Sequence, residues 1–143
     1  MEAEVTPLSR ACLAPGGLLA FALQLAARRP DHKTGQAAGV FLRAASDPLV
    51  WCIAAAMTDA GSVALEFLRS VDTEGKSIME VFNLSREFID ELVWLIDQEG
   101  ILTMPGHLTF IIDWLKTPKH YAVKSTAYVL GGSDGTADVR AHV

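Results

Sequence analysis

Cysteine is scarce in this chain of 143 residues, which has only Cys12 and Cys52, each among apolar neighbours. Two cysteines without a paired spacing argue against a zinc site and against a dense disulfide framework. We expect both to be buried free thiols in a reducing compartment. The four histidines are dispersed along the chain. The sequence therefore predicts no metal site and no bound cofactor.

A long hydrophobic run is also missing. The most apolar stretch, GGLLAFALQLAA, covers residues 16–27 and then meets two arginines. A bilayer span needs about 20 apolar residues, so this stretch is expected to be a core helix. The first residues, MEAE, carry acids in place of the basic start of a signal peptide. We expect a soluble, cytoplasmic protein without membrane contact.

Basic residues are few in the middle of the chain. Residues 59–99 hold three basic and ten acidic side chains, whereas the segments before and after each carry one net positive charge. An acidic segment repels phosphate, so nonspecific attraction to nucleic acid is not expected there.

Helical spacing and capping residues predict a mainly α fold, a helical bundle with a small β-hairpin. Residues 1–15 are expected to form an irregular arm, because Pro7 and Pro15 flank a short apolar patch. Asp47 followed by Pro48 is a strong helix start. The other helices are expected at Gly17–Arg29, Thr34–Ser46, Ser62–Val71, Ser77–Phe82 and Ser85–Glu99, with caps at Thr34, Ser62, Ser77 and Ser85.

The segment after residue 100 allows two interpretations. ILTM and LTFII around Pro-Gly favour a β-hairpin, but a helix from His107 to Lys116 also fits the apolar spacing. STAYVL, residues 125–130, is expected to be a strand or a packed arm. The last residues, 131–143, are small and polar and are expected to be disordered. The predicted divisions are residues 1–58, 59–130 and 131–143.

Residues 62–113 resemble a winged helix-turn-helix of the kind found in bacterial repressors. The matching positions are the turn Leu84-Ser85-Arg86, the apolar Ile89 and Val93 of the third helix, and Gly100-Ile101 before the wing. The resemblance implies a groove-reading third helix followed by a hairpin wing. By helical spacing, the buried side of that third helix is expected to hold Ile89, Leu92, Val93 and Ile96.

The charge of this third helix departs from the pattern of the DNA-binding members. From residue 84 to residue 100 one basic residue, Arg86, stands among five acids. Phosphate contacts depend on Lys and Arg, so this helix is not expected to enter a DNA groove. Trp94 is predicted to face outward beside these acids, as interface anchors do. The alternative left open is that the N-terminal helices of the same chain cover Trp94.

The sequence thus favours a non-catalytic regulator or adaptor that docks a protein partner, expected to be basic, through an acidic surface. The predicted docking residues are Glu87, Asp90, Glu91 and Trp94. The second candidate is a dimeric DNA-binding transcription regulator that holds phosphates through Arg86, Lys116, Lys119 and Lys124. A homodimer fits either function. No catalytic residue is predicted, because no Ser-His-Asp pattern is visible in the sequence, although such groups meet in space.

Overall fold

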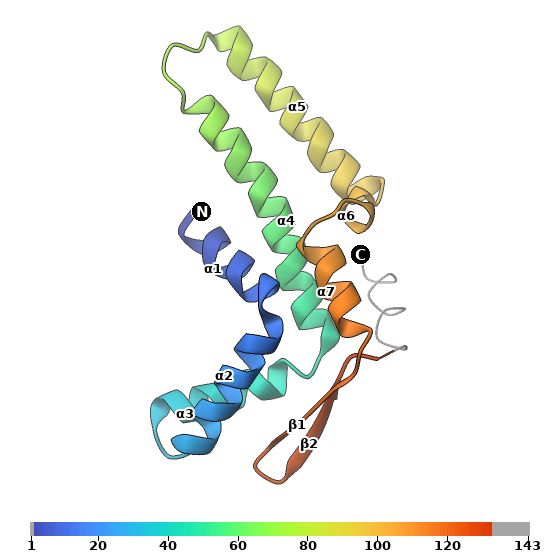
Figure 1. Ribbon diagram of the computed structural model, residues 1–143. Coiled ribbons are helices and arrows are strands. Elements are labelled where there is room, and N and C mark those ends of the chain that lie inside the picture. The colour runs from blue at the N-terminus through green and yellow to red at the C-terminus, as the bar shows by residue number, and fades with distance from the viewer. Residues whose placement is uncertain (1, 133–143) are drawn as a thin grey trace.

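The computed structural model describes residues 2–132 and shows a mainly α fold with one two-stranded β-hairpin, which confirms the predicted class (Figure 1). The elements in chain order are α1 Glu2–Leu13, α2 Pro15–Arg28, α3 Lys33–Ala44, α4 Pro48–Val71, α5 Ile78–Asp97, α6 Gly100–Thr103, α7 His107–Leu115, β1 Lys119–Val123 and β2 Thr126–Leu130.

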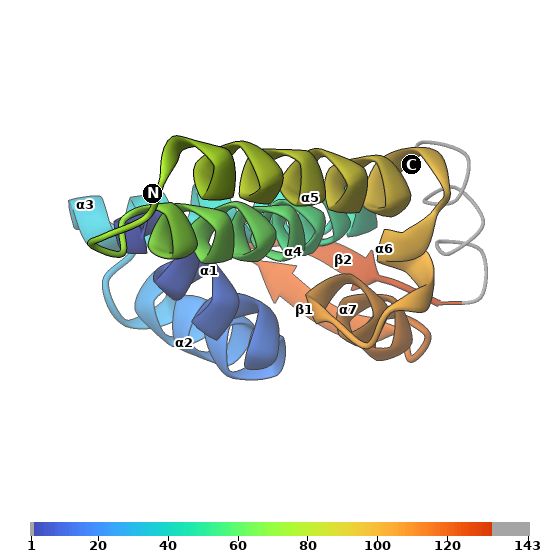
Figure 2. The ribbon, with the colours of Figure 1, turned by 90° about the horizontal axis from the view of Figure 1, so that it is seen from above.

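Helix α4 is the centre of the fold and contacts α1, α5 and α7. Its start was predicted: Asp47 accepts a hydrogen bond from the amide of Leu49, and Pro48 occupies the first turn. Figure 2 shows α5 beside α4, with α1, α2 and α7 on the opposite side of α4. The buried side of α4 carries Trp51, Cys52, Ala55, Thr58, Asp59 and Val63.

Helices α4 and α5 form a long antiparallel pair that projects from the rest of the molecule, away from α2, α3 and the β-hairpin (Figure 1). The predicted capping box begins α5: the Ser77 hydroxyl accepts from the Glu80 amide, and the Glu80 carboxylate accepts from the Ser77 amide. These hydrogen bonds hold the pKa of Glu80 below its ordinary value. The contacts of α5 are mainly with α4 and α6, so much of its surface stays exposed.

Several predicted helix boundaries and irregular segments are wrong, because tertiary packing favours a helix at these positions. Residues 2–13 form α1, which buries Cys12 against α4, so the N-terminus is not an irregular arm. Ser62 does not begin a helix, because its hydroxyl donates to the Thr58 carbonyl within α4. Ser85 likewise donates to the Val81 carbonyl, and α5 runs without a turn through residues 83–85. The predicted division at residue 58 falls inside α4.

Two helix ends also differ from the prediction. The cap of α3 is His32, whose Nδ1 accepts from the amide of Thr34, so Thr34 lies inside the helix. Helix α5 ends at Asp97, two residues before the predicted end at Glu99, which has a left-handed φ of 55°. Gly100 begins α6 and is buried.

The predicted hairpin over residues 101–112 is wrong, and the helical alternative is confirmed by α7. The hairpin lies later in the chain, where β1 pairs with β2 in antiparallel register and Tyr121 faces Tyr128. This confirms the strand expected near residues 125–130. The Tyr121 hydroxyl donates to the Leu42 carbonyl at 2.6 Å and fixes the hairpin to α3. Of the tail predicted to be disordered, residues 133–143 lie outside the described residues.

Two features on which the winged-helix resemblance was based therefore have a different form. The short second helix and the third helix are one continuous helix, α5. The hairpin does not follow that helix directly, because α6 and α7 lie between them.

Candidate functional site

The four predicted docking residues lie on one side of α5. Glu87, Asp90, Glu91 and Trp94 follow one another at spacings of three, one and three residues, which places them on neighbouring turns of a helix. All four side chains are exposed. The structure thus brings together the acidic surface that the sequence predicted.

Trp94 is 41% exposed and lies against the chain's own α6. A Cβ atom added to Gly100 would be 2.5 Å from Cδ2 of the Trp94 ring, which shows that part of the ring covers the Gly100 backbone. The rest of the ring is open. A bulky aromatic side chain that is fixed on one side and exposed on the other is suited to contact a partner at low entropic cost.

A small acidic groove separates α4 from α5 on this side of the helix pair. Its volume is about 110 Å³. The rings of Phe67 and Phe88 stack in it, with centroids 4.5 Å apart and planes 8° apart. Glu66, Glu87 and Glu91 also line the groove, and no Lys or Arg is among the lining residues that the structure describes. The sequence did not indicate this groove, because its walls come from two separate helices.

A strip of exposed apolar side chains runs along a different side of α5. We call it the apolar strip of α5; its members follow one helical stripe and are Ile78, Phe82, Ile89, Val93 and Ile96. The prediction that Ile89, Val93 and Ile96 form the buried side is therefore wrong. The residues that pack on the core are Phe88, Leu92 and Leu95.

The apolar strip and the groove lie on opposite sides of the helix pair. Ile89 and Glu91 are two residues apart, which is about 200° around a helix of 3.6 residues per turn. The core residues Phe88 and Leu92 lie between the strip and the groove on one side of α5. A partner in the groove would therefore leave the apolar strip uncovered.

Helix α4 adds exposed apolar residues of its own: Val50, Ile53, Met57 and Leu68. They recur at helical spacing and, by the same geometry, face away from Glu66, toward the apolar strip of α5. Among the described residues, α4 is the one helix long and apolar enough to cross a membrane by length and composition. One third of its most apolar window is buried inside the protein.

The predicted phosphate-binding residues are not gathered into one site. Arg86 lies on α5, whereas Lys116 caps the end of α7 and Lys119 and Lys124 belong to the β-hairpin, which lies away from α5 (Figure 1). Lys116 pairs with Asp113 at 3.3 Å. Lys119 donates to the carbonyls of residues 114 and 117 and lies over the ring of residue 114, and its partial burial lowers its pKa. Lys124 stands in the hairpin turn with φ 55°.

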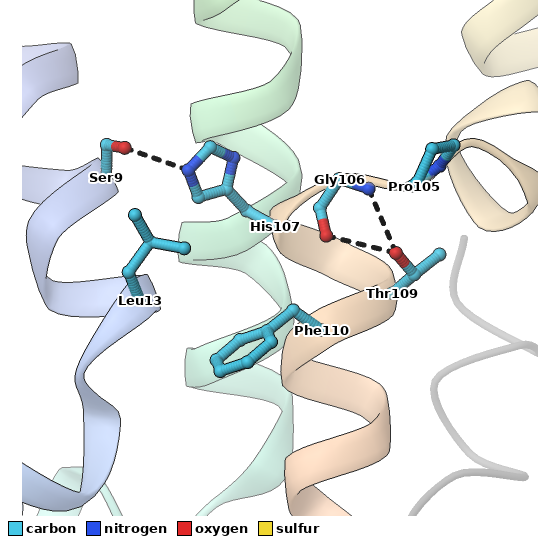
Figure 3. A pocket seen from close by; sticks show the side chains of 7 residues that line it. All are labelled: Ser9, Leu13, Pro105, Gly106, His107, Thr109 and Phe110. Atoms are coloured by element: carbon cyan, nitrogen blue, oxygen red, sulfur yellow. Dashed lines mark hydrogen bonds between the residues drawn. The ribbon is translucent and has the colours of Figure 1, made fainter.

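A second constellation joins α1, α4 and α7. The Ser9 hydroxyl is 2.8 Å from Nε2 of His107 (Figure 3). On the other side of the ring, Nδ1 of His107 is 2.8 Å from Oδ1 of Asp59. Asp59 is 2% exposed, and its carboxylate also accepts from the amides of His107 and Leu108, each at 2.9 Å. The sequence did not reveal this Ser-His-Asp arrangement, because its members stand on three helices that are distant in the chain.

The Ser9–His107 hydrogen bond borders an open hollow of about 700 Å³ on the surface. Figure 3 shows Leu13 on α1 and Phe110 on α7, both below the imidazole ring in this view, and both line the hollow. Pro105, Gly106 and Thr109 also line the hollow. Among the lining residues that the structure describes, none is Lys, Arg, Asp or Glu, and this part of the lining is neutral and largely apolar.

Among the side chains that the structure describes, no group of His, Cys, Asp and Glu is arranged to hold a metal ion. Cys12 and Cys52 are buried free thiols, as predicted. Burial raises the pKa of both, that of Cys52 to about 11. Neither thiol therefore resembles a nucleophilic cysteine, which needs a lowered pKa.

No family model matches this chain, and neither the curated proteins nor the solved structures contain a match.

Proposed function

We propose that this protein is a docking module, an adaptor or a regulator, that binds a basic segment of a partner protein at the groove between α4 and α5. The observation that carries this proposal is the composition of the groove, in which three glutamates surround the stacked rings of Phe67 and Phe88. Carboxylates beside exposed aromatic surface suit the side chain of a Lys or Arg. A cation over an aromatic ring adds about 0.5–1 kcal/mol at an exposed site.

Trp94 extends this surface by one helical turn. Glu87, Glu91 and Trp94 lie on the same side of α5, so one partner segment could contact the groove and the ring together. The ring is already held against Gly100, and little side-chain entropy would be lost on binding. Trp is also among the residue types that most often anchor interfaces.

The charge of α5 selects the kind of partner. Arg86 is the one basic residue of this helix, and Asp90 adds a further acid beside the groove. Basic side chains of a partner would be attracted to these acids and would arrive faster. An acidic partner would be repelled by the same field.

The test uses two designed peptides of roughly 18 residues, about five helical turns. The first carries arginines among leucines, and the second has glutamates at the positions of the arginines. We expect binding of the arginine peptide, measured by fluorescence anisotropy, to weaken with added salt. The glutamate peptide is expected not to bind.

Variants locate the binding surface. Glu87→Lys with Glu91→Lys and, separately, Trp94→Ala should each weaken binding of the arginine peptide by about tenfold or more, since an interface anchor contributes roughly 1–2 kcal/mol. The matched control, Asp31→Lys with Asp113→Lys, changes the net charge equally at exposed positions outside the groove. Equal binding of both peptides, or equal weakening by the control pair, would overturn the proposal.

A second copy of this chain is the occupant we propose for the apolar strip of α5. The five side chains of the strip are each at least 42% exposed, and the apolar residues of α4 extend it. Soluble monomers rarely expose a contiguous apolar surface of this kind unless it is an interaction site. A dimer through this strip leaves the groove on the opposite side open for the basic partner.

The charges that flank the strip fit self-association. Arg86 and Asp97 are eleven residues apart, close to three full turns, so they lie on the same edge of α5. Two copies of α5 packed in antiparallel orientation would bring Arg86 of each copy to Asp97 of the other. Light scattering is expected to give the mass of a dimer for the parent protein. The double variant Ile89→Ser with Ile96→Ser is expected to give the mass of a monomer. A monomeric parent protein at high concentration would refute this assembly.

A further inference from the structure

The Ser9–His107–Asp59 constellation uses none of the docking residues of α5 and points to a separate activity. We propose that Ser9 is a nucleophile, activated by His107 and Asp59, which small neutral esters acylate at Oγ. This goes beyond the docking function and departs from the expectation of a non-catalytic protein.

The geometry supplies each role that nucleophilic catalysis needs. A carboxylate can only accept, so Asp59 Oδ1 fixes the ring proton of His107 on Nδ1. Nε2 of the neutral ring is then the acceptor for the Ser9 hydroxyl at 2.8 Å. This is the order of nucleophile, base and orienting acid by which serine hydrolases are recognised on unrelated folds.

The carboxylate of Asp59, which orients the imidazole, is fixed by further hydrogen bonds besides the one to the His107 ring. Asp59 is buried and accepts from two backbone amides at the start of α7. Gly106 permits this approach, since a Cβ on Gly106 would lie 2.9 Å from either carboxylate oxygen. The carboxylate and the imidazole therefore keep their mutual orientation without substrate, as a preorganised site demands.

The reaction follows from these positions. Ser9 Oγ attacks the ester carbonyl carbon while its proton passes to Nε2 of His107. The bond to the alcohol oxygen then breaks, and that oxygen leaves with the proton from Nε2. Water next attacks the acyl-Ser9 carbonyl, gives a proton to Nε2, and releases the carboxylic acid as the proton returns to Ser9 Oγ.

The lining of the hollow defines the substrate class. Leu13, Pro105 and Phe110 line the hollow beside Ser9, and no Lys, Arg, Asp or Glu is among its described lining residues. Such a surface suits a short apolar acyl group or an aryl ester, and it offers no cation to an acidic substrate.

The backbone donors near Ser9 set the expected rate. The amides of Gly106, His107 and Leu108 already donate to Thr109 and Asp59. A developing oxyanion would thus lack those three donors, and one such donor is worth about 10²–10³ in rate. We expect rapid acylation by activated esters and slow turnover.

The experiment treats the full chain with a fluorophosphonate probe, in which the serine oxygen displaces fluoride from phosphorus. Trypsin releases residues 1–10, a peptide with Ser9 as its single serine, so mass spectrometry reports labelling of this residue directly. We expect labelling of that peptide in native protein and its loss after denaturation. With p-nitrophenyl acetate as substrate, we also expect an initial burst of p-nitrophenol release that is stoichiometric with the protein.

Matched variants separate a nucleophile from a structural hydrogen bond. Ser9→Ala should abolish labelling and burst, while Ser125→Ala, an exposed serine in the hairpin turn, should leave both unchanged. His107→Gln should lower the labelling rate by about 10²-fold or more, the usual contribution of a general base. If His107→Gln unfolds the protein, the Ser9→Cys variant is tested in its place. Iodoacetamide should alkylate the thiol introduced by Ser9→Cys faster than it alkylates free cysteine. The proposal is overturned by an unlabelled Ser9 in folded protein, by equal rates in His107→Gln, or by a slow Ser9→Cys thiol.

Discussion

Asp59 of α4 supplies the cap that His107, the first residue of α7, lacks in its own segment. One carboxylate oxygen of Asp59 accepts from the backbone amide of His107 at 2.9 Å and from its Nδ1 at 2.8 Å. The residue before α7 is Gly106, which has no side chain that could accept these hydrogen bonds. A buried acid from the central helix therefore fixes where α7 begins and holds it against α4.

Replacing Asp59 by alanine should cost about 3 kcal/mol of unfolding free energy, because buried donors at the start of α7 lose their acceptor. Urea denaturation followed by circular dichroism measures this loss. Asp113→Ala is the control, since Asp113 is exposed and pairs with Lys116 at the surface; it should change stability by less than about 0.5 kcal/mol. Similar losses in the two variants would contradict the capping role.

Local signals predicted much of this fold, and the errors share one cause. The Asp47-Pro48 start and the Ser77–Glu80 capping box depend on neighbouring residues, and both are confirmed. Ser62 and Ser85 carry the same kind of signal, yet both lie inside helices, where their hydroxyls donate to the preceding turn. A serine that can cap a helix can also lie within one, and distant packing decides between the two.

The buried side of α5 illustrates the same limit. Two apolar stripes run along this helix: Phe88, Leu92 and Leu95 form one, and the apolar strip of α5 is the other. Helical spacing alone does not say which stripe meets α4. The Ser9–His107–Asp59 constellation could not be predicted for a related reason, because its three positions show no relation until the helices that carry them pack together.

Adjacent residues of α5 should differ sharply in their contribution to stability. Leu95 is 1% exposed, and Leu95→Ala should cost about 2–5 kcal/mol, as for other buried leucines. Ile96 is 61% exposed within one chain, and Ile96→Ala should stay within about 0.5 kcal/mol of the parent protein. Urea denaturation measures both, at protein concentrations low enough that any dimer is dissociated. A large loss for Ile96→Ala under these conditions would mean that the chain itself covers the apolar strip.

The junction between α5 and α6 predicts a stabilising substitution. Glu99 has φ 55°, a conformation that costs a residue with a Cβ about 1–2 kcal/mol. Glu99→Gly should relieve this strain, but glycine also has greater backbone entropy in the unfolded chain, which opposes the gain. The net effect should be an increase of about 0.5–1 kcal/mol in unfolding free energy. Thermal unfolding followed by circular dichroism measures the gain. A lowered melting temperature would contradict the left-handed conformation of Glu99.

The next residue should respond in the opposite direction. Gly100→Ala places a methyl group where the Trp94 ring now lies, 2.5 Å from its Cδ2 atom. The ring must move outward, so the variant should lose about 1 kcal/mol or more. Its tryptophan emission should shift to longer wavelength as Trp94 becomes more exposed. In a Trp94→Ala background the same substitution should lose less stability, because the clash is gone.

Cys52 should make stability fall at alkaline pH. Burial, with a smaller effect of Asp47, raises the pKa of its thiol from 9.0 to about 11. Below pH 9 the thiol is protonated in both states, but between pH 9 and 11 the unfolded chain releases the proton first. The unfolded state is thereby favoured by up to about 2–3 kcal/mol, at about 1.36 kcal/mol for each pKa unit.

Urea denaturation at about pH 8 and about pH 11 measures this loss on the two sides of the titration. Cys52→Ala is the reference, because the other groups titrate in both proteins. The stability of the parent protein should fall further than that of Cys52→Ala over this range. An equal fall would show that the Cys52 thiol ionises alike in the folded and unfolded states, and that its burial does not penalise the thiolate.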